Sequence, residues 1–81
     1  MPTILRSGPY RLYFYSHEPN EPPHIHIDRD NASAKFWTEH VALACNVGFS
    51  VHELGMLLQL VRRHRRFLVE AWHDWFGPDK Q

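Results

Sequence analysis

Residues 21–28 read Glu-Pro-Pro-His-Ile-His-Ile-Asp, a stretch that joins a rigid turn to a short strand. The two prolines fix the backbone before the strand begins, because each one locks its own φ and disfavours helical geometry in the residue before it. Side chains alternate along a strand, so His24, His26 and Asp28 are predicted to share one face. The two isoleucines between them face the other way, and we expect that side to belong to the hydrophobic core.

Strand-forming sequence lies on both sides of this stretch. Upstream, a hairpin is predicted, in which turn residues at 7–9 reverse the chain between two β-prone segments. Downstream, turn residues at 30–33 precede a strand that is predicted to run antiparallel to residues 24–28. A last short strand is expected before the helix, with a helical turn as the alternative. The predicted strands lie within residues 3–46 and comprise 4–5, 10–16, 24–28, 34–38 and 41–45.

The start of a helix is marked by Ser50, which is followed three residues later by Glu53 in the pattern of a capping box. The helix is predicted to run from about residue 50 to residue 76, where Gly77-Pro78 gives a stop signal. At 1.5 Å per residue it would be a rod of roughly 40 Å. This length is large for so small a protein, so a kink near residues 62–66 is the alternative to a straight helix.

Apolar residues recur every three or four positions along this helix, and the resulting stripe is predicted to lie on the sheet. Arg65 falls in the middle of the stripe. It must therefore extend its charge to water, pair with a buried acid, or mark the place where the helix passes the edge of the sheet. A second stripe of Met56, Leu60 and Phe67 lies to the side, and it is either a wide core face or a surface for a partner. The main stripe comprises Leu54, Leu57, Leu58, Val61, Leu68, Trp72 and Trp75.

These patterns predict an α+β fold and a single domain over residues 1–81. In this fold, a small antiparallel sheet of four to five strands packs against one long C-terminal helix. A domain of this size buries only roughly 60–65% of the surface that its unfolded chain exposes. A protein partner or a homodimer would therefore add stability.

The chain carries nine basic and nine acidic side chains, so its formal net charge is zero. Any attraction to nucleic acid must therefore come from a local patch. The single cysteine, Cys45, excludes an internal disulfide and fits a reducing compartment; it is expected to be an inert core thiol. There is no leader segment, and no apolar run approaches the roughly 20 residues of a membrane span. We expect a soluble, cytoplasmic protein with no membrane association.

His24 and His26 stand two residues apart on the predicted strand, a spacing that can bring two imidazoles to one metal ion. Asp28 is the first candidate for the third ligand. The other candidates for that ligand are Glu18, His17 and His73. These residues predict a site for a divalent metal such as zinc. The alternative is a solvated strand face whose imidazoles bond to neighbouring carboxylates and tyrosines.

Residues 62–66 read Arg-Arg-His-Arg-Arg and form the one dense basic run. On a helix, Arg62 and Arg66 share one flank, and Arg63 lies farther round. Aromatic side chains of the sheet would add stacking surfaces for single-stranded RNA if they lie near these arginines. A solvated helix face is the alternative. The residues predicted to bind RNA or DNA are Arg62, Arg63, Arg66, Tyr13, Tyr15 and Trp37.

His73 lies near the end of the predicted helix, close to Glu70 and Asp74. A neighbouring carboxylate would orient its ring for general acid or base catalysis. If the protein cleaves RNA without a metal, His24, His26 and His73 would share proton transfer and an arginine would stabilise phosphate charge. The alternative role for His73 is a favourable interaction of its imidazolium with the helix dipole.

Motifs are spread along nearly the whole chain, at residues 1–5, 13–16, 18–19, 21–26, 34–37, 48–49, 53–54 and 70–73. Together they resemble a family of small prokaryotic proteins that is classed as a domain of unknown function, with Pro-Pro-His-x-His as its hallmark. The resemblance implies a protein partner, because such proteins are often encoded beside a second small uncharacterised protein, as in toxin–antitoxin loci or mobile gene cassettes. It implies no catalytic residue. His40 departs from the proline of the family, which affects only the approach to the next strand.

The sequence therefore predicts a small interaction protein, as a component of a toxin–antitoxin pair or of a mobile cassette. Such a protein would bind a protein partner and also RNA or DNA. Two alternatives stay open from the residues alone. One is a metal-binding protein or small metal-dependent hydrolase that uses His24 and His26, and the other is a non-catalytic dimerisation module.

Overall fold

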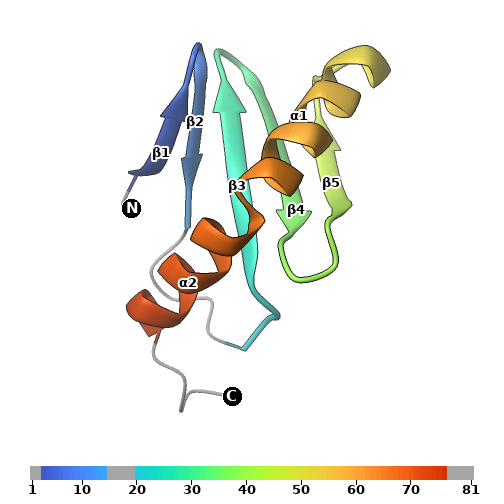
Figure 1. Ribbon diagram of the computed structural model, residues 1–81. Coiled ribbons are helices and arrows are strands. Elements are labelled where there is room, and N and C mark those ends of the chain that lie inside the picture. Colours follow the sequence, from blue (N-terminus) through green and yellow to red (C-terminus); the bar gives the residue numbers. More distant parts are fainter. Residues whose placement is uncertain (1–2, 15–19, 77–81) are drawn as a thin grey trace.

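The computed structural model describes residues 3–14 and 20–76 and shows five strands followed by two helices (Figure 1). The predicted α+β fold and antiparallel sheet are thereby confirmed. Neither helix has the length and apolar character that are needed to cross a membrane. The elements are β1 (Thr3–Ser7), β2 (Tyr10–Tyr13), β3 (His24–Arg29), β4 (Ala32–Trp37), β5 (Ala42–Val47), α1 (Val51–Arg63) and α2 (Arg65–Phe76).

The strands form one antiparallel sheet in which neighbours along the chain are neighbours in space. β3 lies at the centre, and β1 and β5 are the two edges (Figure 1). β3 and β4 form the predicted antiparallel pair, from His24 opposite Trp37 to Arg29 opposite Ala32, and β4 begins at Ala32 rather than at residue 34. The turn between them contains Asp30, whose φ of 53° lies in the left-handed region that aspartate tolerates.

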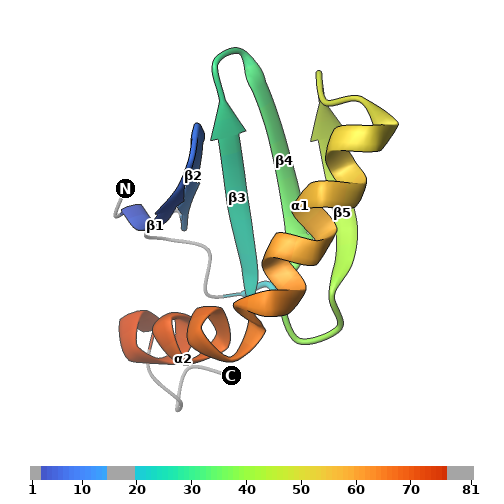
Figure 2. The same ribbon diagram turned by 45° about the horizontal axis from the view of Figure 1, so that its top comes forward.

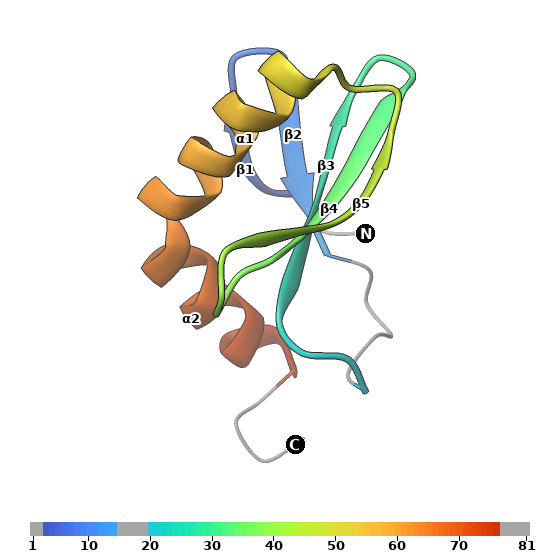
Figure 3. The same ribbon diagram turned by 90° about the vertical axis from the view of Figure 1, so that its right-hand side faces the viewer.

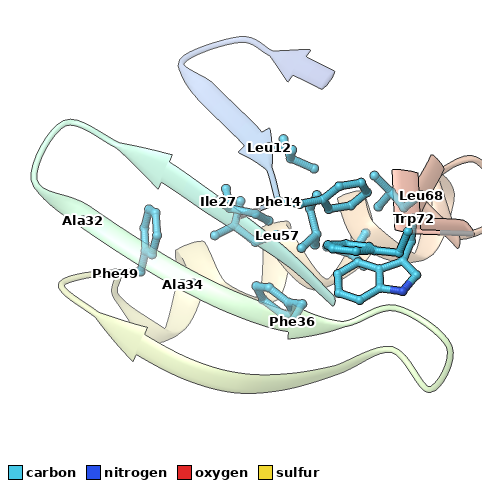
Figure 4. Packing of buried hydrophobic residues seen from close by; sticks show 13 residues of the cluster. Leu12, Phe14, Ile27, Ala32, Ala34, Phe36, Phe49, Leu57, Leu68 and Trp72 are labelled. Carbon is cyan, nitrogen blue, oxygen red and sulfur yellow. The ribbon is translucent and has the colours of Figure 1, made fainter. Parts of the chain in front are cut away.

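Both helices lie on the same side of the sheet, and the core fills the space between the two layers. α1 crosses the sheet and α2 continues toward the start of β3 (Figures 2 and 3). Ile25 and Ile27 of β3 are fully buried in this core, as predicted from the alternation. Figure 4 shows Phe14 against Trp72 of α2, with ring centroids 5.2 Å apart. The other core residues are Leu12, Ala32, Ala34, Phe36, Phe49, Leu57, Val61, Leu68 and Phe76.

The prediction of one long C-terminal helix is wrong, because the helix is interrupted at His64. His64 has φ −104° and ψ 15°, and its ring nitrogen Nδ1 lies 3.1 Å from the Leu60 carbonyl oxygen, which also accepts from the His64 backbone N–H. A continuous helix would place Arg65 in the apolar stripe. After the break, Arg65 is exposed and its Nε donates to the Glu39 carbonyl at 3.0 Å. The break thus keeps this charge out of the core.

Two strand predictions also need correction. The last strand is β5, which extends to Val47 rather than ending at Cys45. Cys45 is exposed rather than buried in the core, because β5 is an edge strand. β2 ends at Tyr13, and the predicted continuation over residues 15–16 lies outside the described residues.

The turn from β5 into α1 is held by the side chain of Asn46, which donates to the Phe49 carbonyl and accepts from the Phe49 N–H, both at 3.1 Å. Gly48 between them has a φ of 94°, and a Cβ there would lie 3.3 Å from the backbone of Ala32. Ser50 then caps α1 by accepting from the Glu53 N–H at 3.1 Å. This tight connection sets the direction in which α1 crosses the sheet.

Glu53 joins the first turn of α1 to the sheet, instead of returning to Ser50 as a capping box would require. Its carboxylate accepts from Arg29 Nε at 2.5 Å and Nη2 at 2.9 Å, and from the Tyr10 hydroxyl at 2.7 Å. The hydrogen bonds from Arg29 first, and then from Tyr10, hold the pKa of Glu53 below the 4.5 of an unperturbed glutamate. The same bond to Glu53 raises the pKa of Tyr10 above 10.0. We call these three residues the acidic clamp.

The acidic clamp predicts a pH-dependent contribution to stability. Because the pKa of Glu53 is depressed in the folded state, its contribution is present above about pH 4.5 and is lost as the pH falls through the folded-state pKa. Glu53→Gln should therefore lower the free energy of unfolding at pH 7 and change it less at pH 3. Denaturant unfolding at the two pH values measures this. Glu70→Gln, at an exposed position, is the control and should be nearly neutral at both.

Candidate functional site

The sheet face opposite the helices carries Tyr13, His26 and Lys35 in register on β2, β3 and β4. The Tyr13 ring stacks on His26, with centroids 5.4 Å apart and planes at 21°. The Tyr13 hydroxyl donates to Asp28, 3.1 Å from each carboxylate oxygen. Tyr13 and His26 are both buried. This cluster is packed into the fold and is not a solvated strand face.

His24, at the start of β3, is fully buried and contacts rings from three elements. Its ring centroid lies 4.8 Å from that of Trp72 on α2, 5.1 Å from that of His26 and 5.8 Å from that of Trp37 on β4. Its Nδ1 lies 2.9 Å from the carbonyl oxygen of Pro22, the geometry of a ring N–H that donates to the turn. The rigid turn and α2 therefore meet at this histidine.

Charged side chains on the same face are paired locally. The Lys35 ammonium lies 2.5 Å from a Glu21 carboxylate oxygen and 4.8 Å from the Trp37 ring centroid. The Arg11 guanidinium lies 4.5 Å from the centroid of Tyr13. Glu21 of the turn is thereby tied to β4, and these cations are engaged with groups of the fold.

The three ligands predicted for a metal do not form a recognisable centre. Within residues 3–14 and 20–76, no group of three histidine, cysteine, aspartate or glutamate side chains is placed to hold a metal ion. Both oxygens of Asp28 accept from Tyr13. The candidate ligands His17 and Glu18 lie outside the described residues. A zinc site at His24, His26 and Asp28 thus stays a prediction from spacing.

His73 lies on α2, one residue after Trp72 and away from the buried stripe. Its Nδ1 is buried and has no hydrogen-bond partner in the part of the chain that the structure describes. The ring contacts of His24 and His26 within that part involve Tyr13, Trp37 and Trp72, and His73 is not among them. Shared proton transfer by the three imidazoles thus stays a prediction from the sequence.

The predicted nucleic-acid surface is divided between two layers. Arg62, Arg63 and Arg66 are all exposed and lie beside the helix break. Tyr13 and Trp37 project from the opposite face of the sheet, as their register with His26 and His24 shows. Tyr15 is outside the described residues. The sequence could not separate these groups, because the layer that each side chain occupies depends on the tertiary fold.

A different surface emerges along one side of the two helices. Met56, Phe67 and Trp75 are 51%, 48% and 49% exposed. Met56 and Phe67 each precede a buried residue by one position, so they lie on the same side of their helices. Trp75 also precedes a buried residue, Phe76. The sequence predicted that Trp75 would lie in the core, but Phe76 lies there instead. Of the second stripe of the sequence, Met56 and Phe67 thus lie on the surface, whereas Leu60 is partly buried against the core.

A cavity of about 260 Å³ adjoins this stripe, between the β1–β2 turn and α1. Its walls include Pro9, Tyr10, Leu57 and Leu60, with Arg63 beside them. We call Met56, Leu60, Arg63, Phe67 and Trp75 the helical flank. The spacing of Met56, Leu60 and Phe67 was visible in the sequence, whereas Trp75 was assigned to the core stripe. The cavity depends on where the β1–β2 turn lies.

Comparison with known proteins gives one match. A family model described as Domain of unknown function (DUF4160) matches residues 10–73. This match runs from β2 into α2 and includes β3, the acidic clamp and the helical flank except Trp75. No curated protein and no solved structure shows significant similarity to the chain.

The burial of His24 predicts a structural contribution. His24→Ala should lower the free energy of unfolding by about 2–4 kcal/mol, because it leaves a cavity among the surrounding rings. His40→Ala, at an exposed position, should change it by less than about 0.5 kcal/mol. Urea unfolding monitored by tryptophan fluorescence compares the two. Equal stabilities would show that His24 is not part of the packed structure.

Proposed function

The chain belongs to the family described as Domain of unknown function (DUF4160), and we propose that it is an interaction protein that binds a partner protein through the helical flank. The family description assigns no activity, so the proposal rests on the surface of this chain. The observation that carries it is the exposure of Met56, Phe67 and Trp75 on the two helices, together with a cavity that Met56 lines beside Arg63. Large apolar side chains gathered on one surface are typical of interaction sites.

The chemistry of the helical flank specifies the kind of partner. The cavity is lined largely by apolar residues, Met56 among them, so it suits one apolar side chain of a partner. Phe67 and Trp75 would extend the contact along α2, and buried aromatic residues often dominate binding energy. Arg63 at the rim favours a carboxylate. The partner segment that fits is therefore an amphipathic one, with an apolar face and acidic neighbours.

A pair of small proteins that inhibit or stabilise one another is the biological setting we infer for this surface. Toxin–antitoxin components and mobile-cassette proteins bind a dedicated partner, and the motifs of this chain resemble proteins encoded in such pairs. A small domain also gains stability when a partner covers its apolar surface. We therefore propose that the product of an adjacent gene is the partner to test.

Substitutions in the helical flank should weaken binding of that partner. Met56→Glu and Phe67→Glu place a negative charge on the apolar surface and should weaken binding at least about tenfold, a change of about 1.4 kcal/mol. Co-expression with the adjacent gene product, followed by isothermal titration calorimetry, measures the affinity.

The matched control is Val47→Glu, an exposed apolar position on β5. It should bind the partner like the wild-type protein. Wild-type affinity in both flank variants, with unchanged folding, would reject the helical flank as the binding surface.

A second candidate function is binding of RNA or DNA, which the arginines at the helix break favour. Arg62, Arg63, Arg65 and Arg66 are all exposed within five residues of a chain whose net charge is zero. Arg66 faces Glu70 at 3.7 Å with both side chains largely exposed, a pair of little strength in water. These guanidinium groups are therefore suited to phosphate.

This candidate predicts salt-dependent binding of single-stranded RNA. Each arginine that contacts a phosphate contributes about 0.7 to the slope of log affinity against log salt. Arg62→Ala and Arg66→Ala should reduce both the affinity and the slope, whereas Arg11→Ala on the opposite sheet face should not. Fluorescence anisotropy over a range of salt concentrations tests this. Absence of binding at low salt would reject the nucleic-acid function and leave the partner proposal unaffected.

A further inference from the structure

The edge strand β5 is unusual because it lacks the side chains that normally prevent an exposed strand from pairing with another chain. Its outer side pairs with no strand in the described part of the chain, and all six residues are exposed. The sequence Ala-Leu-Ala-Cys-Asn-Val contains no charge and no proline. Natural proteins usually place lysine, proline or inward charges on such edges to prevent pairing with other chains. Those side chains are missing from β5.

This edge also exposes large apolar side chains. Leu43 and Val47 of β5 are 44% and 62% exposed. The opposite edge of the sheet, β1, differs because it carries Arg6. The two edges are therefore not equivalent, and β5 is the one that suits a further strand.

The strand β5 contains a bulge. Lys35 pairs with Cys45 and Phe36 pairs with Leu43, so Ala44 is an extra residue without a partner on β4. A bulge exchanges the faces of the residues on its two sides. The side chains before and after Ala44 consequently do not follow one continuous alternation between the two faces of the sheet.

This bulge makes β5 complementary to itself. Ala42 pairs with Trp37 and Val47 pairs with Ser33. Trp37 and Ser33 are four residues apart on β4, so they share a face, and Ala42 and Val47 share that face too. In an antiparallel pair of two β5 strands, Ala42 of one would lie opposite Val47 of the other. Opposed residues must face the same side of a sheet, and this pairing satisfies that condition.

We propose that a second copy of this chain pairs with β5 in antiparallel orientation, joining the two sheets into one. A second copy fits because the strand matches itself and because two uncharged strands meet without like-charge repulsion. The added strand would cover Val47 and Leu43 and would bond the outer backbone groups of β5. This dimer uses the edge opposite β1 and does not rest on the helical flank.

The size of the contact sets the expected affinity. Pairing of two six-residue strands buries less than the roughly 1,200–2,000 Å² of a standard stable interface. The dimer is therefore weak and concentration-dependent. Sedimentation equilibrium at protein concentrations between about 10 μM and 1 mM should show a shift from monomer to dimer. Dissociation constants in this range correspond to weak affinities.

Val47→Lys tests the surface. In the paired state it would place one lysine at each end of the contact, and it should weaken dimerisation at least about tenfold. Phe67→Lys makes the same charge change on the helical flank and should leave dimerisation unchanged. A protein that stays monomeric at about 1 mM, or a dimer that survives Val47→Lys and is lost in Phe67→Lys, would overturn the proposal.

The single cysteine provides a second measurement. Cys45 lies next to the centre of the proposed pairing, so a short bis-maleimide should join Cys45 of two copies by addition of each thiol to one maleimide. Cys45→Ser removes the product. The double variant Cys45→Ser with His52→Cys places an exposed thiol away from the strand and should give far less covalent dimer. Equal yields from the two cysteine positions would indicate random collision and contradict strand pairing.

Discussion

Burial of β3 on both of its faces is the constraint on which the rest of the structure depends. Ile25 and Ile27 fill the core under the helices, while His24 and His26 are buried among rings on the other side. A slip of one residue would exchange the two faces, so the strand has a single acceptable register. β2 and β4 pair to that register, and α2 reaches it through Trp72.

The sequence predicted those features that have local causes. Alternation identified the two faces of β3, and Ser50 identified the start of α1 within one residue. A straight helix was predicted in place of the interruption at His64, with a kink near residues 62–66 as the alternative, because the apolar period continues on both sides of His64. Arg65 was the sign of the break, but whether a misplaced charge bends a helix or extends to solvent depends on the backbone beside it, here the Glu39 carbonyl.

The candidate site was harder to predict, because the tertiary structure decides which polar side chains form hydrogen bonds within the fold and which stay exposed. Asp28 and Glu53 serve tyrosine and arginine partners within the sheet and at the start of α1. Asp28 had been assigned to a metal from its spacing alone. Four exposed arginines make the helix break locally cationic although the formal net charge of the chain is zero. No count of charges along the chain could show this division.

The sequential order of the strands has a consequence for how the chain folds. Each strand pairs with the one before it, so the sheet has a low contact order and can grow hairpin by hairpin as the polypeptide leaves the ribosome. The bond between Tyr10 and Glu53 spans 43 positions and can close only after α1 has been synthesised. Until then the apolar side of the sheet lacks its cover, which makes the interval before helix docking the period of greatest exposure to aggregation and proteolysis.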